Sequence, residues 1–374
     1  MRAPAPLLAL PGSAVVSWRP GVKIQQTGHS FWRGFLSRGT NMDFLVVGAG
    51  FGEQHLTWIS ECPGARVRLI GYRRDGDRAR RLAARFPGAT ATADPLSAIT
   101  AGAVDALVVA SPPDTHERYL AAGLAAGLRV VSDKPLAHDL PTAARLAEAA
   151  AGHPGRAAVS FQWRANRALR VLRELCARGE LGELVHLDLD FRHDFLAGPR
   201  TAWPWRHRWE TAGAGALGDQ GVHLFDLLAW LAPGSWAVTA GTASVVWPRR
   251  SHGPDQVACE TDDVAEVLLG RDDGAARARV FVSRVSTGER ALRVRVQGAD
   301  GSAEVSANPD DGSATLRRHP AGSSTDFGPD PMNPYPGLLS GDDPVTVADF
   351  TAGHAAQALV EQALRAGCDK PISH

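Results

Sequence analysis

Lysine is almost missing from this 374-residue chain. Only three of its 40 basic residues are lysine: Lys23, Lys134 and Lys370. Arginine therefore supplies nearly all of the positive charge. Lysine, unlike arginine, can lower its pKa and transfer a proton. We therefore expect a lysine that persists in such a chain to be there for its chemistry.

The chain also has few cysteines and no net charge. The four cysteines (Cys62, Cys176, Cys259 and Cys368) form no CxxC pair, which disfavours a disulfide framework or a zinc site and indicates a reducing cytoplasm. Forty basic residues balance forty acidic ones, whereas a nucleic-acid-binding protein needs a basic face. No apolar run approaches the ~18 residues of a membrane span. We expect a cytoplasmic protein that binds neither nucleic acid nor membrane.

The first 41 residues differ from the rest. They contain five basic residues, no acidic residue and no helix or strand period. We interpret residues 1–41 as a disordered extension, or as sequence upstream of a natural start at Met42. An arm that wraps a partner subunit is the alternative.

From Met42 onward, short apolar runs alternate with helical stretches. This alternation predicts βαβ units and a parallel sheet, with a ligand at the carboxyl ends of the strands. We therefore expect residues 42–157 to form a doubly wound Rossmann domain that binds NAD(P). The apolar runs cover residues 43–47, 66–71, 104–110 and 128–132.

The second half has a different pattern. One amphipathic helix over residues 166–180 is followed by long alternating runs, which predict mostly antiparallel strands with one apolar face. We expect an α+β domain with a large open sheet over residues 158–346, of which residues 307–346 form a loop. Residues 347–374 should supply a last helix, over about 347–366, and a tail. Because the strands offer more apolar face than one helix can cover, we expect a homodimer or homotetramer.

A glycine-rich loop follows the first apolar run. The stretch "GAGFG" places Gly48, Gly50, Phe51 and Gly52 between a strand and a helix start, where backbone N–H groups and the helix dipole bind anions. In a GxGxxG motif, the third glycine would stand where this chain has Glu53. We interpret the loop as a dinucleotide site with an irregular pyrophosphate end. A plain strand–helix turn is the alternative.

Two arginines follow the second apolar run. This junction usually carries an acid that binds the ribose diol of NAD, but here Arg73 and Arg74 precede the first acid, Asp75. Guanidinium groups bind phosphate in a bidentate way. The pair therefore predicts a preference for NADP(H), with NAD(H) possible. The alternative is that both arginines are solvated surface charges.

Together with the glycine loop, three further stretches resemble the Gfo/Idh/MocA oxidoreductases, the family of glucose–fructose oxidoreductase and inositol dehydrogenases. The resemblance extends over about residues 43–368. The stretches are "VDALVVASPPDTH" (104–116), "VVSDKPLAHDL" (130–140) and "GALGDQGVHLFDLLAWL" (215–231).

The resemblance implies three catalytic residues. The family's Glu-Lys-Pro reads here as Asp133-Lys134-Pro135, and its DxGxH pattern gives Asp219 and His223. In the family, the lysine and the histidine contact the substrate hydroxyl near the nicotinamide. We assign those roles to Lys134 and His223, with Asp219 as their acidic partner.

The resemblance also implies cofactor contacts. Ser111 and Pro112 match the family's loop along the nicotinamide ribose, and Gln162 lies where the family lines the cleft. We add His116, which begins the next helix, and the neighbouring residues Asp133 and Lys134. His116 as a capping residue is the alternative.

The chemistry of these residue types agrees with the assignment. Hydride transfer from a carbinol needs a group that takes the hydroxyl proton, and a lysine charge stabilises a developing alkoxide. Asp219 and His223 stand four residues apart, so they share one face of a helix. A core histidine and a helix N-cap are the alternatives for His223 and Asp219 taken singly.

Other residues near these motifs are open to two readings. The stretch "TAWPWRHRWE" (201–210) packs three tryptophans and three basic side chains together, as a substrate wall or as a core-packing loop. By resemblance we place Arg164 in the cleft, and we interpret Asp226 as structural.

These observations predict an NADP-dependent oxidoreductase of a sugar, cyclitol or related hydroxyl or keto compound. The alternatives are a reductase of an imine or enone, a cofactor-binding regulator without turnover, and a transient-redox glycosidase.

Overall fold

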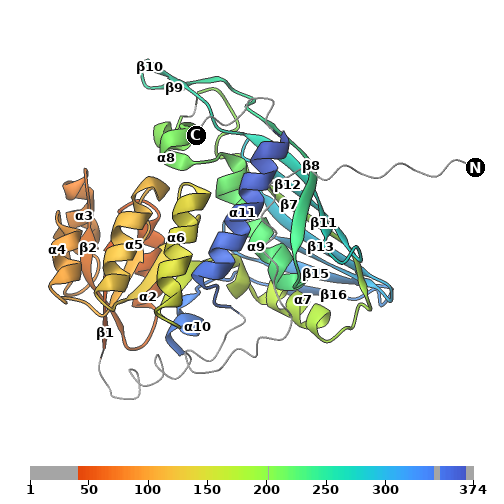
Figure 1. Cartoon of the computed structure of the whole chain (residues 1–374), viewed down its shortest axis with the longest axis horizontal. Helices are drawn as coiled ribbons and strands as arrows, with labels where there is room; N and C mark the ends of the chain where they lie inside the picture. The colour runs from red at the N-terminus through yellow and green to blue at the C-terminus, as the bar shows by residue number, and fades with distance from the viewer. Residues whose placement is uncertain (1–40, 201, 341–345, 368–374) are drawn as a thin grey trace, which may run out of the picture.

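The computed structural model describes residues 41–200, 202–340 and 346–367. Two sheets face each other across a layer of helices (Figure 1). The predicted disordered extension (1–41) lies outside the described residues, apart from residue 41, and so does the tail from 368 onward. Among the described residues, no helix has both the length and the apolarity needed to cross a membrane.

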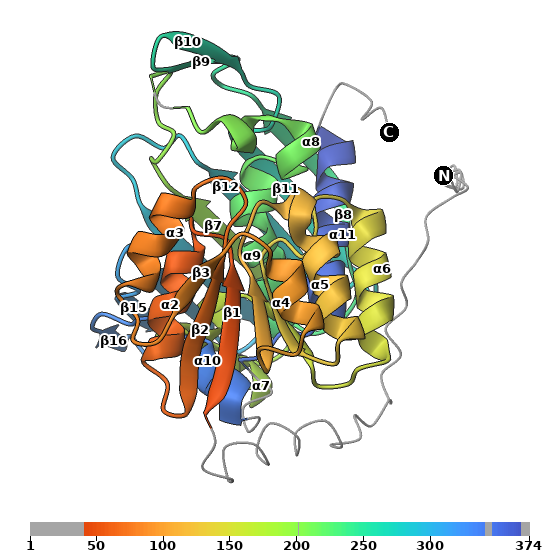
Figure 2. The same cartoon turned by 90° about the vertical axis from the view of Figure 1, so that its left-hand side faces the viewer.

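The first sheet is parallel and six-stranded, in the order β3-β2-β1-β4-β5-β6. Helices α2 and α3 lie on one side of it and α4, α5 and α6 on the other (Figure 2). The order reverses between β1 and β4, the point at which doubly wound folds bind ligands. The predicted Rossmann fold is confirmed. Its elements are β1 (Met42–Val47), α2 (Gly52–Ser60), β2 (Ala65–Gly71), α3 (Gly76–Ala83), β3 (Thr90–Thr92), α4 (Pro95–Thr100), β4 (Ala106–Val109), α5 (His116–Ala125), β5 (Arg129–Asp133), α6 (Leu140–Ala151) and β6 (Ala157–Ser160).

Local sequence explains these elements. Strand β4 is buried on both faces and is a continuous apolar run, and β1 is apolar except for Asp43. Three helices begin directly after an aspartate whose carboxylate accepts a backbone N–H of the first turn. These aspartates are Asp75, Asp94 and Asp139, which cap α3, α4 and α6.

The second sheet has eight strands in the order β16-β15-β14-β13-β7-β12-β11-β8. Its pairings are antiparallel except that of β7 with β12, as the predicted mostly antiparallel sheet requires. Helices α7, α9 and α11 cover its inner face (Figure 1). The elements are α7 (Arg167–Ala177), β7 (Leu184–Arg192), α8 (Trp209–Ala212), α9 (Val222–Leu231), β8 (Trp236–Ser244), β9 (Arg249–His252), β10 (Asp255–Ala258), β11 (Val264–Arg271), β12 (Arg277–Ser283), β13 (Ala291–Gly298), β14 (Ser302–Ala307), β15 (Ala314–His319), β16 (Ser324–Phe327), α10 (Tyr335–Ser340) and α11 (Phe350–Gly367).

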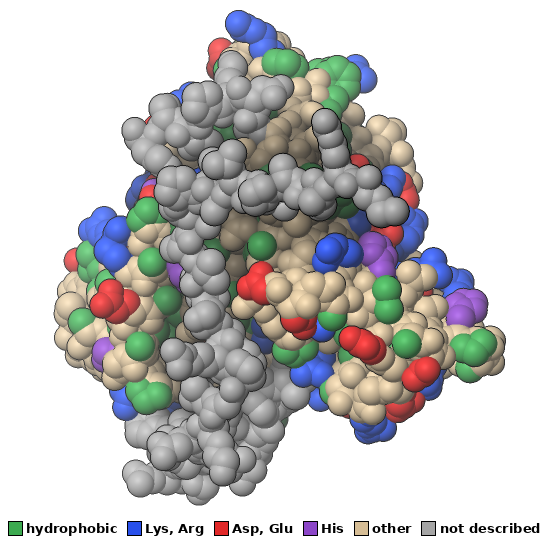
Figure 3. Space-filling model, turned by 45° about the vertical axis from the view of Figure 1, so that its right-hand side comes forward, with side chains coloured by type: hydrophobic (Ala, Val, Ile, Leu, Met, Phe, Trp, Pro, Cys, Tyr) green, Lys and Arg blue, Asp and Glu red, His purple; other side chains and the backbone are tan. Residues whose placement is uncertain are grey.

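The outer face of this sheet carries many charged side chains, with apolar ones such as Leu268, 46 % exposed, among them. Arg279 pairs with Asp188 at 3.0 Å and with Glu266 on the neighbouring strands, and Arg192 pairs with Asp190 at 2.8 Å. On the described surface that faces the viewer in Figure 3, acidic, basic and hydrophobic side chains are interspersed. Three helices, rather than the one that the sequence indicated, cover the apolar side chains on the inner face of the sheet.

The prediction of a loop over residues 307–346 was wrong. This stretch contains β15, β16 and α10.

We call residues 330–340 the C-terminal strap, because they lie across α2 of the parallel layer. Trp58 Nε1 donates to the carbonyl of Pro331 at 2.8 Å, and the hydroxyl of Tyr335 lies 2.8 Å from Nδ1 of His55. Tyr335 thereby joins the hydrophobic core beneath α2.

Candidate active site

The glycine loop forms an open cradle at the end of β1. Gly48 has a φ of 114°, and a Cβ there would lie 2.5 Å from the carbonyl oxygen of Ala110, so only glycine lets β1 and β4 meet. A Cβ on Gly50 would meet nothing within 4 Å, which leaves room for a ligand to approach the backbone. Gly52 faces Val46, where a Cβ would lie at 3.4 Å. The cradle therefore fits a pyrophosphate, and Gly52 provides the close helix–strand packing expected of the motif's third glycine.

Glu53, which departs from the motif, turns away from the cradle. Its carboxylate pairs with Arg85 and, at 3.5 Å, with Arg78 of α3. Phe51, next to the cradle, is 42 % exposed. The acid is thus engaged by two guanidinium groups and does not stand unpaired beside a phosphate.

Arg73 and Arg74 are exposed at the carboxyl end of β2. Neither has an ion-pair partner among the residues that the structure describes. The first acid after them, Asp75, accepts the backbone N–H of Arg78 at 2.8 Å as the N-cap of α3. Two guanidinium groups, and no carboxylate committed to a ribose, therefore border this edge of the sheet.

His116 is buried behind the loop that carries Ser111 and Pro112. Its Nε2 donates to the carbonyl of Ser111 at 2.8 Å, and its Nδ1 lies 3.1 Å from the carbonyl oxygen of Leu136. Burial lowers the pKa of the ring. His116 thus ties the loop after β4 to the loop after Lys134, and its ring is only 1 % exposed.

Lys134 and Asp219 meet at the carboxyl end of β5. The ammonium of Lys134 donates to Oδ1 of Asp219 at 2.8 Å and to its backbone carbonyl at 2.6 Å. Arg206 contacts the other carboxylate oxygen, Oδ2, at 2.8 Å. Burial would raise the pKa of Asp219, but the charges of Arg206 and Lys134 and their hydrogen bonds hold it well below its usual range. Two of the three ammonium protons are committed, and one is left for the cleft.

His223 lies beside this pair as a neutral imidazole. Its ring is 2 % exposed and packs edge-on against Phe161, with centroids 5.8 Å apart. Burial and then the charge of Lys134 lower its pKa well below the ordinary value, against the opposing charge of Asp219. Nδ1 of His223 is buried and has no hydrogen-bond partner among the described residues. The ring is therefore held in its neutral form beside Lys134.

The expectation of one regular helix through Asp219 and His223 was wrong. Leu217–Gly221 form a π-helical turn, and α9 begins only at Val222. The buried carboxylate of Asp262 accepts the backbone N–H groups of Gly215 at 2.7 Å and Leu217 at 2.8 Å, and so holds the entry to this turn. No sequence motif marked Asp262.

Arg206 is a second site residue that sequence reasoning missed. Its guanidinium carbon lies 4.4 Å from the ring centre of Trp203 and 4.5 Å from that of Trp205. The aromatic and basic loop (201–210) was the available signal. Residue 201 lies outside the described part, while Trp203 is 46 % exposed and His207 is fully buried. The loop therefore combines features of both proposed readings.

Gln162 and Arg164, which follow β6, lie in different environments. Oε1 of Gln162 is buried and has no hydrogen-bond partner in the described part of the chain. Arg164 was wrongly placed in the cleft, because its guanidinium makes two hydrogen bonds to Asp226, at 2.6 and 2.8 Å, in the core. Asp133 is buried beside His55, with Oδ1 and Nε2 3.8 Å apart.

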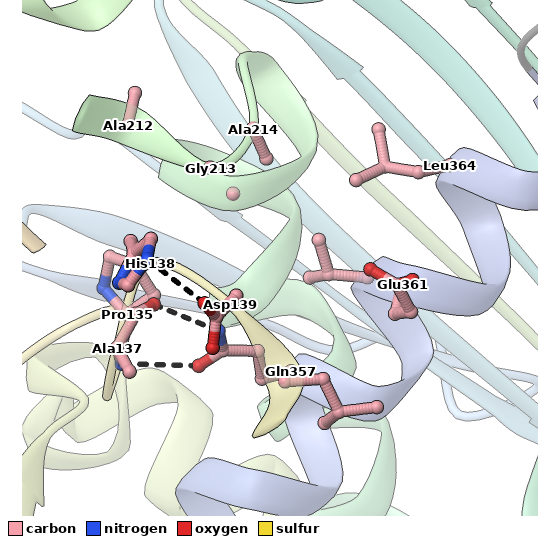
Figure 4. Close-up of a pocket in the computed structure, with 13 residues that line it drawn as sticks. Pro135, Ala137, His138, Asp139, Ala212, Gly213, Ala214, Gln357, Glu361 and Leu364 are labelled. Atoms are coloured by element: carbon pink, nitrogen blue, oxygen red, sulfur yellow. Dashed lines mark hydrogen bonds and ion pairs between the residues drawn. The ribbon is translucent and has the colours of Figure 1, made fainter. Parts of the chain in front are cut away.

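A small pocket lies behind the loop that carries Lys134 (Figure 4). It is lined by residues 135–140, the turn 212–214 and α11, and not by the side chains of the catalytic candidates. Gln357 of α11 spans its floor, where it accepts from the backbone N–H of Ala137 at 3.2 Å and donates to its carbonyl at 2.8 Å. The last helix therefore fixes the loop that positions Lys134.

Parallel sheet, glycine cradle and a lysine beside a neutral histidine together define a nicotinamide-dependent oxidoreductase that acts on CH–OH groups. Residues 42–161 match the model of an oxidoreductase family with an NAD-binding Rossmann fold. Residues 169–304 match the GFO/IDH/MocA C-terminal domain. The chain belongs to the Gfo/Idh/MocA oxidoreductase family, as the sequence resemblance predicted.

Similar proteins agree with this assignment. A putative UDP-kanosamine synthase oxidoreductase subunit of Amycolatopsis mediterranei is 32 % identical over 272 residues, 70 % of this chain and 74 % of the relative. An inositol 2-dehydrogenase of Leifsonia xyli is 34 % identical over 210 residues, 55 % of this chain and 57 % of the relative. A solved levoglucosan dehydrogenase in complex with NADH and L-sorbose shares the fold, with a TM-score of 0.76 at 20 % identity, over 88 % of this chain and 98 % of the other.

Proposed function

We propose that this protein is an NADP-dependent oxidoreductase that transfers a hydride between nicotinamide and a hydroxyl or keto group of a sugar, cyclitol or related small molecule. One observation carries the proposal: Lys134, paired with Asp219, and the neutral His223 converge where β5 ends. The nicotinamide, when bound, supplies the hydride acceptor or donor.

The residues of the chain divide the proton chemistry between them. In the oxidation direction, the neutral ring of His223 accepts the hydroxyl proton. The remaining N–H of Lys134 donates to the same oxygen and stabilises the negative charge that develops there. Asp219 holds the ammonium in place. In the reduction direction, protonated His223 returns the proton.

The substrate class rests on the relatives and on the cleft wall. Curated relatives are named inositol 2-dehydrogenase and levoglucosan dehydrogenase, which act on polyhydroxylated rings. The exposed indole of Trp203 beside Arg206 supports the same class, since an aromatic face packs on the C–H face of such a ring.

The cofactor preference rests on the edge of β2. Solved relatives carry NADH, and the matched family model is named for NAD. In this chain Arg73 and Arg74 lack ion-pair partners within the described residues, and the carboxylate of Asp75 caps a helix. Unpaired guanidinium groups favour the 2′-phosphate of NADP.

Turnover of a panel of sugars and cyclitols tests the proposal. Wild-type protein should reduce NADP⁺ with at least one of them. Lys134→Met should lower kcat by about 10²–10⁴ and leave the Kd for the cofactor within a few-fold. His223→Asn should act similarly, and the double variant should fall short of additivity because both groups act on one oxygen. Near-wild-type kcat in Lys134→Met would contradict the assignment.

A further inference from the structure

Arg206 is an unusual neighbour for a catalytic carboxylate. It holds the oxygen of Asp219 that Lys134 does not contact, at 2.8 Å. Trp203 and Trp205 flank its guanidinium, with ring centres 4.4 and 4.5 Å from the guanidinium carbon. A cation against aromatic faces gains electrostatic attraction and loses rotational freedom. The guanidinium is therefore fixed before any substrate arrives.

The backbone of the loop is equally well anchored. The N–H of Arg206 donates to the carbonyl of Trp203 at 2.8 Å, and its own carbonyl accepts from the hydroxyl of Thr261 at 2.8 Å. Nε2 of the buried His207 accepts the N–H of Trp203 at 3.1 Å. Preorganisation of this kind keeps a charged group in one geometry without an entropy cost at the moment of reaction.

The following inference rests on the proposed function. We propose that Arg206 is a positioning residue, which fixes Asp219 so that one N–H of Lys134 remains available for the substrate oxygen. Without the guanidinium, Oδ2 of Asp219 would be a buried anion with no partner. The carboxylate would then turn both oxygens toward the Lys134 ammonium and also accept a hydrogen bond from its third N–H.

The charge balance around Asp219 makes the role measurable. Four titratable or charged groups face it from separate elements: Lys134 after β5, Arg206 in the loop before α8, His223 on α9 and His193 after β7. Removal of Arg206 deletes one of the two cations that keep the carboxyl ionised. Protonated Asp219 would no longer hold Lys134. As the pH is lowered, kcat should therefore begin to fall at a higher pH than in the wild type.

Arg206→Gln is the test variant, and Arg208→Gln is its matched control. Arg208 stands two residues away and is exposed. In Arg206→Gln we expect kcat to fall about 10- to 100-fold, with KM and the Kd for NADPH within about threefold. The acid limb of the kcat profile should move up by about one pH unit or more. Arg206→Lys should return the limb toward its wild-type position, and Arg208→Gln should match the wild type throughout.

Two other outcomes would overturn the inference. A raised KM with unchanged kcat and acid limb would make Arg206 a substrate contact. An equal loss at every pH, together with a lowered melting temperature, would make it a structural residue only.

A measurement without turnover separates this inference from the proposed function. The ¹³C resonance of the Asp219 carboxyl, assigned with Asp219→Asn, should titrate at a higher pH in Arg206→Gln than in the wild type. If the wild type oxidises no sugar, the proposed function fails, while the titration still decides the role of Arg206. Identical titrations in both proteins would refute the positioning role of Arg206.

Discussion

At the scale of single residues, we propose that the end of β2 sets the choice of cofactor. Arg73→Asp would replace the cation proposed to bind the 2′-phosphate with an acid that repels phosphate and accepts from the ribose hydroxyls. A hydrogen bond to a charged group contributes about 1.5–3 kcal/mol, and each 1.4 kcal/mol is about tenfold in affinity. We expect NADPH binding to weaken about tenfold to hundredfold, and NADH binding to improve modestly. Fluorescence titration of both cofactors measures the two Kd values.

Arg81→Asp provides the control for this prediction. Arg81 is exposed on α3 and makes no ion pair within the described residues. Its replacement changes the net charge by the same amount, so the ratio of the two Kd values should stay at its wild-type level. Equal wild-type affinities, or a ratio that Arg73→Asp leaves unchanged, would reduce Arg73 to a surface charge.

His207 should make the stability of the fold depend on pH. Its ring is fully buried, and burial, together with the charges of Arg284 and Arg250, lowers its pKa to about 4. The unfolded chain takes up the proton near pH 6.5, but the folded protein does not. Stability is therefore fully present above about pH 6.5 and is lost progressively as the pH falls toward 4.

Denaturant unfolding of wild type and His207→Gln between pH 4 and 7.5 tests this. Glutamine offers an acceptor for the N–H of Trp203 and does not titrate. The difference between the two free-energy curves should change by about 1–3 kcal/mol over that range, since one pKa unit corresponds to about 1.36 kcal/mol. Parallel curves would show that His207 does not cause the acid sensitivity.

At the scale of elements, the C-terminal strap should stabilise α2. Tyr335→Phe keeps the ring against Phe44, with which it packs edge-on at 5.9 Å, but leaves Nδ1 of the buried His55 without its partner. A buried polar group without a partner costs about 1–3 kcal/mol. We expect the free energy of unfolding to fall by that amount.

Tyr119→Phe is the matched control for the strap. Tyr119 is also buried, and its hydroxyl makes no hydrogen bond within the part of the chain that the structure describes, so the change should stay within about 0.5 kcal/mol. Equal stability of the two variants would show that the hydroxyl of Tyr335 contributes nothing to the docking of the strap.

The same elements show what the sequence could and could not reveal. Strands such as β1 and β4 were predictable because burial on both faces produces apolar runs. β3 is only three residues long, Thr90–Thr92, and has no such run. α10 lies among glycine and proline residues, and its apolar face is explained only by a surface of α2 that is some 280 residues away.

The site divides in the same way. Lys134, Asp219 and His223 were found because they belong to motifs. Arg206 and Asp262 act through single contacts with residues far from them in the chain, and no local spacing encodes such contacts. The π-helical turn at Leu217–Gly221 could not be predicted for the same reason, since the N–H groups of Gly215 and Leu217 donate to the carboxylate of the distant Asp262.

At the scale of the whole molecule, the charged sheet face bears on assembly. We propose that this face contacts a second copy of the chain in a homodimer or homotetramer. The charged groups on this face, such as Arg279 with Asp188 and Arg192 with Asp190, would make the contact sensitive to salt, because the Debye length falls from about 10 Å at 0.1 M to about 3 Å at 1 M. Light scattering at micromolar concentration should give a multimer that weakens in 1 M NaCl. A monomer at low salt would contradict the proposal.

The C-terminal strap also has a consequence for how the chain is made. The apolar surface of β1 and α2, which includes Phe44 and Leu56, is completed only by Tyr335, Leu338 and Leu339. During synthesis, most of the remaining polypeptide must leave the ribosome before these last side chains arrive. A nascent or truncated chain that ends before the strap therefore leaves this apolar surface exposed. Premature termination anywhere between α6 and α10 should yield a client for chaperones and proteases.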